Sequence, residues 1–288
     1  MLAGVRTAVT EIGRSFLPEF IQSQTPAKEL PLRLFVAGFG RSGTTSLAHA
    51  LEQLGYTPCY GPPCLRKIAD RLKQYHTGEL EGGWQTLFQS FDVAGLDALG
   101  YQRQWYRDAA KMGLPVILTV RDSAEAWADS WAETIGTHFF YMGQRPFTFM
   151  PVHERLGPYL EEYFHRFAPG YAFPPSNFDF LERRGLAEAY EALVADVKTS
   201  IPPQQLLVFN SKDGWAPLCA FLHQHGQLVQ CPRTPYPRSG DRATMVAIGY
   251  VMGFLTWTWL AIPLFPIILV WLCYRRCSRS KREKAKRS

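Results

Sequence analysis

Short apolar runs alternate with stretches of helical periodicity through the middle of the chain. Residues 32–37, 115–120 and 205–209 are apolar and rich in β-branched or aromatic side chains, which is typical of buried strands. Helical patterns follow over residues 44–54 and about 124–135. Strands that alternate with helices predict an α/β fold, with a parallel sheet covered by helices on both faces. The aromatic-rich residues between 138 and 180 give no clear pattern.

A second pattern lies near the C-terminus. From Met245 to Tyr274 the chain carries no charged residue over 30 positions, most of them apolar. A helix that crosses a bilayer needs only about 20 such residues. Pro263 and Pro266 interrupt the run, so it predicts either one kinked transmembrane helix or a hairpin that enters the membrane and returns.

Apolar residues also recur at helical spacing before Pro18, which predicts an amphipathic arm. The arm either packs on the domain, lies on a membrane surface or acts as a targeting segment. The predicted organisation is an arm over residues 1–30, a P-loop domain over residues 31–242, a membrane anchor over residues 243–274 and a basic tail over residues 275–288.

The charge is concentrated in that tail. The formal net charge is +6, but residues 275–288 carry eight Lys or Arg and one acid, so the rest of the chain is close to neutral. This argues against a nucleic-acid partner. The positive-inside rule places the tail on the cytosolic side. A hairpin would then leave the body cytosolic as well, and we favour this arrangement. A single span would place the body in the lumen. A tail anchor would keep the body cytosolic but place the basic tail in the lumen, against the rule.

The six cysteines are sparse and show no CxxC spacing, so we expect unpaired structural thiols and no metal site.

The candidate chemistry lies in the loop Gly38-Phe-Gly-Arg-Ser-Gly-Thr-Thr-Ser46, between a strand and a helix. Backbone N–H groups at such a turn can converge on a phosphate. As a Walker loop, the segment has Thr44 in place of the required lysine. As a dinucleotide fingerprint, it lacks the acid expected about 20 residues further on, because residues 56–61 contain none.

The third interpretation accounts for every position. Arg41-Ser-Gly-Thr-Thr45 resembles the 5′-phosphosulfate loop of sulfotransferases. A sulfuryl group in transfer carries less charge than a phosphoryl group, so one cation and a nest of N–H groups can neutralise the leaving phosphate without magnesium. The resemblance implies 3′-phosphoadenosine-5′-phosphosulfate (PAPS) as the co-substrate, with adenosine 3′,5′-bisphosphate as the product.

A second stretch, residues 116–122 followed by Trp127 and Ser130, resembles the other sulfotransferase signature. There an arginine at the end of a strand and a serine on the next helix hold the 3′-phosphate, and here Arg121 and Ser130 fill those positions. The residues that the resemblance assigns to PAPS binding are Gly40, Arg41, Ser42, Gly43, Thr44, Thr45, Ser46, Arg121 and Ser130.

Residues 206–222 resemble one branch of the family, the Sulfotransfer_4 type, and we assign them to the fold rather than to catalysis. The closing stretch Pro237-Arg-Ser-Gly-Asp241 is similar to another motif of that branch. The resemblance covers residues 34–241, with gaps between 138 and 200. It departs from the family at Gly61-Pro-Pro63, so the acceptor cannot be inferred from relatives.

Sulfuryl transfer to a hydroxyl or amine needs a general base. None of the seven histidines lies near residues 90–110, where the family places the base, so we predict a carboxylate, Asp97 ahead of Asp92. An aromatic lining from Phe139, Phe140, Tyr141 and Phe147 suits a small apolar alcohol or a lipid acceptor. The sequence thus predicts a membrane-attached sulfotransferase. The alternatives are a non-catalytic nucleotide-binding membrane protein and, less well supported, an NAD(P)-dependent oxidoreductase.

Overall fold

The computed structural model describes residues 29–96, 102–149, 151–168, 170–239 and 242–259, together with residues 261, 264, 265, 270, 271, 274 and 275. The N-terminal arm up to residue 28 and the tail from residue 276 lie outside these residues.

Within the described residues, four parallel strands form the sheet, in the order β2-β1-β3-β4. The three predicted strands are present as β1 (Leu34–Ala37), β3 (Val116–Thr119) and β4 (Leu206–Phe209). The fourth, β2 (Val93–Ala94), has only two residues, too few for a pattern to predict it. It pairs with the amino-terminal half of β1. The α/β fold with a parallel sheet is therefore confirmed.

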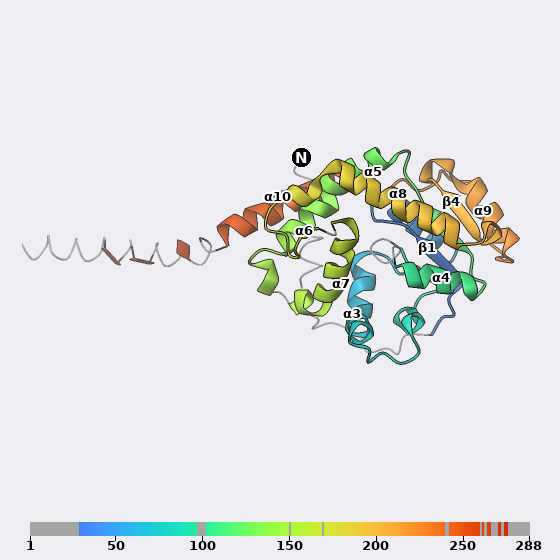
Figure 1. Ribbon diagram of the computed structural model, residues 1–288, viewed down its shortest axis with the longest axis horizontal. Helices are drawn as coiled ribbons and strands as arrows, with labels where there is room; N and C mark the ends of the chain where they lie inside the picture. Colours follow the sequence, from blue (N-terminus) through green and yellow to red (C-terminus); the bar gives the residue numbers. More distant parts are fainter. Residues whose placement is uncertain are drawn as a thin grey trace, which may run out of the picture.

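Helices surround the sheet, as Figure 1 shows. Connections between parallel strands need crossovers, and helices provide most of them. The helices are α2 (Thr44–Gln53), α3 (Gly61–Thr77), η1 (Trp84–Phe88), α4 (Arg103–Lys111), α5 (Ala124–Trp131), η3 (Ala132–Gly136), α6 (Thr137–Met142), η4 (Phe147–Phe149), α7 (Pro151–Phe167), η5 (Asp179–Leu181), α8 (Arg183–Ser200), η6 (Pro203–Gln205), η7 (Ser211–Asp213), α9 (Trp215–Gln224) and α10 (Arg242–Thr258).

Alternate residues of β1 point into two separate cores, as expected for a strand covered on both sides. Leu34 and Val36 pack with residues of α2 and α9. Phe35 and Ala37 pack in the larger core, with residues of α3, α4, α5, α7 and α8. This larger core is rich in aromatic rings, and the segment around residues 138–180 that gave no pattern contributes many of them as α6 and α7.

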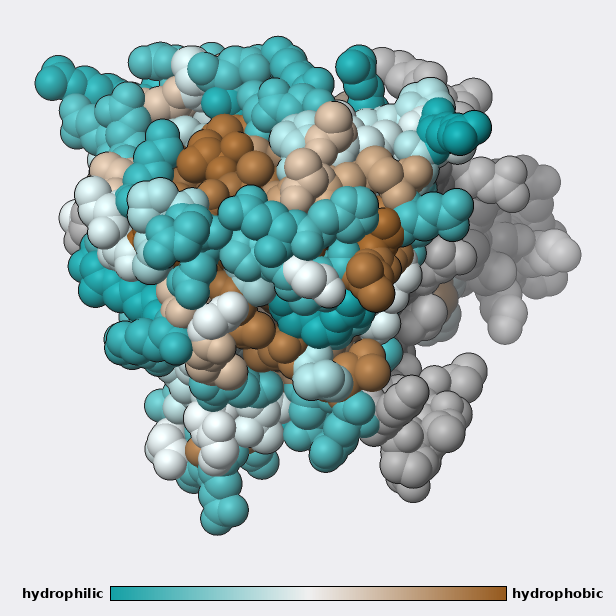
Figure 2. Space-filling model, turned by 90° about the vertical axis from the view of Figure 1, so that its right-hand side faces the viewer, coloured by the Kyte–Doolittle hydropathy of each residue, from teal (hydrophilic) through white to brown (hydrophobic). Residues whose placement is uncertain are grey.

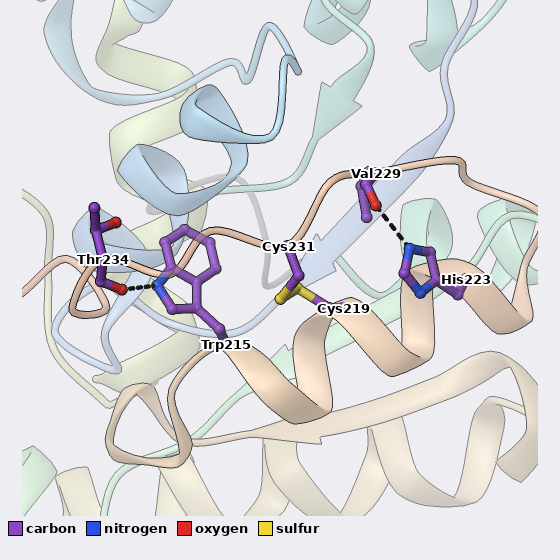
Figure 3. The surroundings of a disulfide bond; sticks show 6 residues. All are labelled: Trp215, Cys219, His223, Val229, Cys231 and Thr234. Atoms are coloured by element: carbon purple, nitrogen blue, oxygen red, sulfur yellow. Dashed lines mark hydrogen bonds between the residues drawn. A yellow bond between two sulfur atoms is a disulfide. The ribbon is translucent and has the colours of Figure 1, made fainter.

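The segment after α9, residues 226–239, is called the strap here. Side chains at positions 215, 219 and 223 lie on one face of α9, since residues four apart share a helix face, and all three bind the strap (Figure 3). The three links are Trp215 Nε1 to the Thr234 carbonyl oxygen (2.8 Å), a disulfide between Cys219 and Cys231, and His223 Nε2 to the Val229 carbonyl oxygen (2.7 Å).

The expectation of unpaired thiols is therefore wrong for four cysteines. Besides the bridge of the strap, Cys59 is joined to Cys64. Neither separation is a recognisable motif, and only the fold brings the partners together. Cys273 and Cys277 lie outside the described residues.

The predicted membrane segment is described only in part. Among the residues that the structure describes, no helix combines the length and the apolar character needed to cross a bilayer. Instead, α10 packs beside α6, at the end of the molecule opposite α9 (Figure 1). The face that carries β4 and α9 is largely hydrophilic, with hydrophobic residues in small separate groups (Figure 2).

Candidate active site

The predicted motifs meet at one edge of the sheet, because all four strands are parallel and their carboxyl ends lie together. The glycine-rich loop leaves β1 and Arg121 follows β3, its neighbour in the sheet. The loop packs closely against the end of β3 and against η7, which follows β4. A Cβ atom on Gly38 would be 2.3 Å from Thr119 Oγ1, and one on Gly43 would be 2.8 Å from Ser211 Oγ.

The loop has an unusual backbone. Arg41 has a φ of 74°, in the left-handed region that residues other than glycine rarely adopt. Such a residue costs on the order of 1–3 kcal/mol, and it persists where the surroundings impose it. Trp127 helps to impose it here, because its Nε1 donates to the carbonyl oxygen of Gly40 at 2.9 Å. Strain of this kind is typical of functional loops.

This conformation joins the two predicted motifs. Nε of Arg41 donates to Oγ of Ser130 on α5 at 3.2 Å, across 89 residues of sequence. Ser130 is buried, while Arg41 is partly exposed. A guanidinium group and a hydroxyl group, predicted independently to bind the same nucleotide, therefore lie in contact.

Three hydroxyl side chains of the loop bind partners within the protein. Ser42 Oγ donates to the carbonyl oxygen of Phe39 at 2.5 Å and lies 2.6 Å from Thr119 Oγ1. Ser46 Oγ exchanges hydrogen bonds with the backbone of Ser239, at the end of the strap. Thr45 Oγ1 lies 2.5 Å from the hydroxyl of Tyr60. These side chains shape the loop.

The start of α2 supplies backbone donors. Its N-cap, Gly43, has a φ of 98°, and no side chain among the described residues caps the helix there. The first N–H groups of a helix have no partner within the helix, and they favour an anion. Backbone groups of Gly43, Thr44 and Thr45 are therefore available to a phosphate or a sulfate, beside Arg41.

Arg121 lies at the same edge and is exposed. Its backbone N–H donates to the hydroxyl of Tyr190 at 2.8 Å, and Tyr190 in turn stacks on Trp127. Tyr190 thus holds the second motif at both Arg121 and Trp127, and sequence reasoning missed it because α8 carries no motif. The neighbouring Asp122 forms its ion pair with Lys212.

Asp92 does not lie at this edge. Its backbone carbonyl accepts from Arg33 N and Leu34 N at the amino end of β1, whereas the loop follows the carboxyl end. At about 3.3 Å per residue, the two are roughly 16 Å apart. The carboxylate accepts from Thr57 N at 2.7 Å and lies 3.7 Å from Arg33 Nη1. Asp92 therefore lies too far from the loop for the predicted role as the base, and its contacts indicate a structural role instead.

Asp97 lies outside the described residues. The strand that precedes it, β2, runs parallel to β1 and therefore ends at the edge that carries the loop. Gly95, the residue after β2, lies close to β1, since a Cβ atom there would be 2.3 Å from the carbonyl oxygen of Val36. The role of Asp97 stays a prediction.

The structure adds a residue that the sequence did not suggest. His138 on α6 lies within electrostatic reach of Arg41, although it is far from residues 90–110. Burial, and to a smaller extent the charge of Arg41, lower the pKa of His138 below its usual value. The only sequence signal was its position two helical turns after Ser130.

The aromatic lining expected for the acceptor is not formed by the predicted rings. Phe139, Phe140 and Phe147 are each less than 10% exposed. Phe139 packs against Trp131 and Tyr163 in the core. Tyr141 is partly exposed. Three of the four predicted residues thus serve the core.

A cavity of about 520 Å³ lies elsewhere, between the C-terminal end of α2 and the strap. Gln53, Leu54 and Arg233 are among its lining residues. The ten residues of α2 place it roughly 15 Å from the glycine-rich loop. It therefore contains none of the predicted site residues.

The strained loop, the uncapped helix start and the Arg41–Ser130 contact define an anion-binding α/β transferase of the sulfotransferase type. Residues 33–245 match the family model of the sulfotransferase domain, Sulfotransfer_4. The chain belongs to this family, as its motifs had indicated. A search of curated proteins finds no match.

Proposed function

We propose that the protein transfers a sulfuryl group from PAPS to a hydroxyl or amine of a small acceptor. The observation that carries this proposal is the 3.2 Å contact between Arg41 and Ser130, which unites the two nucleotide-binding motifs in one site. The donor supplies a sulfuryl group attached to a good leaving group, the 5′-phosphate.

The residues present suit such a donor, which is anionic at both ends. The backbone N–H groups of Gly43, Thr44 and Thr45, together with the guanidinium of Arg41, would hold the phosphosulfate. Arg121 and Ser130 would hold the 3′-phosphate, Arg121 through its planar fork. The left-handed backbone of Arg41 preorganises the loop before the ligand arrives.

Arg41 would also act on the transfer step. Charge develops on the leaving phosphate as the sulfur–oxygen bond lengthens, and a fixed cation beside it stabilises that charge. Because Arg41 is held by Ser130, the guanidinium needs little reorganisation when the charge appears.

The proton of the acceptor needs a base, and two side chains compete for this role. Asp97 is the candidate from the sequence, supported by the direction of β2 toward the loop edge. His138 is the candidate from the structure, supported by its position two turns after Ser130, which contacts Arg41, and by its electrostatic interaction with Arg41. Variants of the two residues would separate these roles.

We also propose that the C-terminal segment attaches the protein to a membrane and that the acceptor is lipophilic. The support is the uncharged run over residues 245–274. On α10, Tyr250, Phe254 and Trp257 are each more than 60% exposed and recur at helical spacing, so they form an apolar stripe. Aromatic side chains of this kind favour a membrane interface.

The disulfides bear on the topology. Such bridges persist mainly in oxidising compartments, which favours a luminal body over the cytosolic body expected from the sequence. A single span would then leave the basic tail on the cytosolic side, as the positive-inside rule requires. Protease protection of the body in intact microsomes would support this arrangement, and digestion of the body would contradict it.

Calorimetric titration of the full chain with adenosine 3′,5′-bisphosphate tests the proposed function. We expect saturable binding, weakened about 10- to 100-fold in Arg121→Ala, because a hydrogen bond to a charged group contributes about 1.5–3 kcal/mol. Arg184→Ala is the matched control, since this arginine pairs with Glu188 on the surface of α8. Absence of binding by the wild type, or unchanged titration curves for Arg121→Ala, would contradict the proposal.

A further inference from the structure

The helix that carries Ser130 has an irregular turn. Between α5 and α6 the chain forms a π-helical turn, η3, in which Thr137 Oγ1 donates to the carbonyl oxygen of Ala132 at 2.9 Å. In a regular α-helix, His138 would be rotated by about 80° from Ser130, which lies eight residues earlier. The extra residue of a π turn brings it back to within about 20° of the same face. His138 therefore lies about two turns from Ser130, on the side of the helix that Arg41 contacts.

A hydrogen bond fixes which nitrogen of His138 carries the proton. Nε2 lies 2.8 Å from the backbone carbonyl oxygen of Met245 on α10. A carbonyl oxygen can only accept, so Nε2–H is the donor and Nδ1 of the neutral ring keeps a free lone pair. Gly249 packs against the same pair of residues, since a Cβ atom there would be in ordinary contact with Thr137 Cγ2 at 3.4 Å and with the His138 ring at 3.6 Å.

The surroundings of His138, its burial above all, favour the neutral ring. Burial is the largest cause of its lowered pKa, and the charge of Arg41 lowers it further, while the bond to Met245 opposes both. The other charged groups on the helices packed here, Glu133 of η3 and Arg242 of α10, form an ion pair with each other. A neutral imidazole beside a cationic anion site is suited to accept a proton near neutral pH.

We propose that His138 is the general base of the transfer, an inference that rests on the proposed function. The acceptor oxygen forms a bond to sulfur with its own electron pair, and the bond from sulfur to the bridging phosphate oxygen breaks. That oxygen keeps the electron pair as part of adenosine 3′,5′-bisphosphate. The acceptor proton passes to Nδ1 of His138, and α10 holds the ring through Met245.

If His138 is the base, α10 has two roles in the proposed site. The same helix that presents the apolar stripe of Tyr250, Phe254 and Trp257 outward holds the proposed base inward. An acceptor that partitions into a membrane would therefore arrive beside the base.

The test compares His138→Gln with the wild type. The amide N–H of Gln can still donate to the Met245 carbonyl, but Gln has no basic nitrogen. Release of adenosine 3′,5′-bisphosphate from PAPS is followed between pH 5 and 9, with dodecanol in detergent or water alone as the acceptor. Wild-type kcat should rise with pH as one group loses its proton. In His138→Gln it should fall about 100-fold or more, and that rise should disappear.

Two controls separate a chemical role from a structural one. His165→Gln alters a partly exposed histidine on α7 and should behave as the wild type. Calorimetric titration of His138→Gln with adenosine 3′,5′-bisphosphate should match the wild type, which would show that the fold and the donor site remain intact.

Other outcomes would overturn the proposal. If His138→Gln keeps the wild-type rate and pH profile, His138 is not the base. If Asp97→Asn removes the pH-dependent rise while His138→Gln does not, the carboxylate is the base. If the wild type neither binds adenosine 3′,5′-bisphosphate nor releases it from PAPS, the proposed function itself fails, and the assignment of His138 fails with it.

Discussion

The two sides of the candidate site are built in different ways. On the donor side, the loop from Gly38 to Ser46 is one continuous stretch, and Arg121 and Ser130 lie within ten residues of each other. On the proposed acceptor side, η3 and α6 meet α10 through contacts between distant residues. His138 and Met245 are 107 positions apart, and Glu133 and Arg242 are 109 apart.

This difference explains which side is visible as a motif. A phosphate site needs several N–H groups in consecutive order, so it requires a fixed local spacing. A base needs only one side chain in the right place, and any element that packs there can supply it. Binding of the nucleotide and turnover should therefore respond separately to substitutions on the two sides.

The largest effect should come from Arg41, on the donor side. Arg41→Ala removes the cation beside the leaving phosphate, and loss of one such group typically lowers kcat by about 10²–10³-fold. Arg41→Lys keeps a charge but loses the planar fork, so it should recover only part of the rate. Steady-state release of adenosine 3′,5′-bisphosphate from PAPS provides the measurement. Equal rates for Arg41→Ala and the wild type would remove this residue from the transfer step.

The strap should give the next largest effect, on stability rather than on rate. A disulfide that closes a loop of about this length contributes on the order of 3 kcal/mol to the free energy of unfolding. The double substitution of Cys219 and Cys231 to serine should therefore lower that free energy in urea under non-reducing conditions. Since the strap ends against Ser46, it should also weaken nucleotide binding. If native wild-type protein reacts with thiol reagents at these two positions, the bridge is absent.

On the acceptor side, Gly253→Val should disturb the contact between α10 and α6. A Cβ atom at this position would lie 2.7 Å from the hydroxyl of Tyr141, and overpacking of this kind typically costs about 1–3 kcal/mol. Turnover should fall while the affinity for adenosine 3′,5′-bisphosphate stays unchanged. Gly249→Ala is the control, because a Cβ atom at this position would make only ordinary contacts, the nearest at 3.4 Å. A parallel loss of nucleotide affinity would show that the two sides are not independent.

The sequence predicted the strands beside the donor side closely because they are apolar runs that end in motifs. The boundaries of β1, β3 and β4 differ from the predicted strands by two residues or fewer. Strand β2 was missed because two residues form no period, and its position depends on β1. The register of Asp92 with the amino end of β1, which moves it away from the loop, could not be known without that pairing.

The sequence could not predict the proposed acceptor side, because its residues are brought together only by the fold. The rings of Phe139 and Phe140 were expected around an acceptor, but α7 covers Phe139 and both rings serve the core. Apolar residues fill cores and line pockets alike, so composition does not separate the two. The uncharged run after residue 244 predicted a membrane segment, yet its first turns pack on α6 through Gly249 and Gly253. Small residues at this spacing are equally compatible with close helix packing in either environment.

The smallest effect should come from Asp92, and it tests the placement of this residue at the far edge. In Asp92→Asn the amide oxygen can still accept from Thr57 N, and only the 3.7 Å ion pair with the partly exposed Arg33 is lost. Such a pair contributes at most about 1 kcal/mol. Turnover should therefore match the wild type. A large loss of turnover in a folded variant would return Asp92 to the mechanism.

The same variant has a pH signature. Burial is the largest influence on the pKa of Asp92 and raises it, so the native state binds this proton more tightly than the unfolded state. The resulting stabilisation is fully present below the unfolded pKa near 4 and is lost as the pH rises through the folded pKa. The wild type should therefore lose stability relative to Asp92→Asn as the pH rises from about 4 toward neutrality. Urea unfolding of both proteins across this range measures the difference. A constant difference would mean that the carboxylate is not desolvated, and that β2 does not hold it against β1 as described.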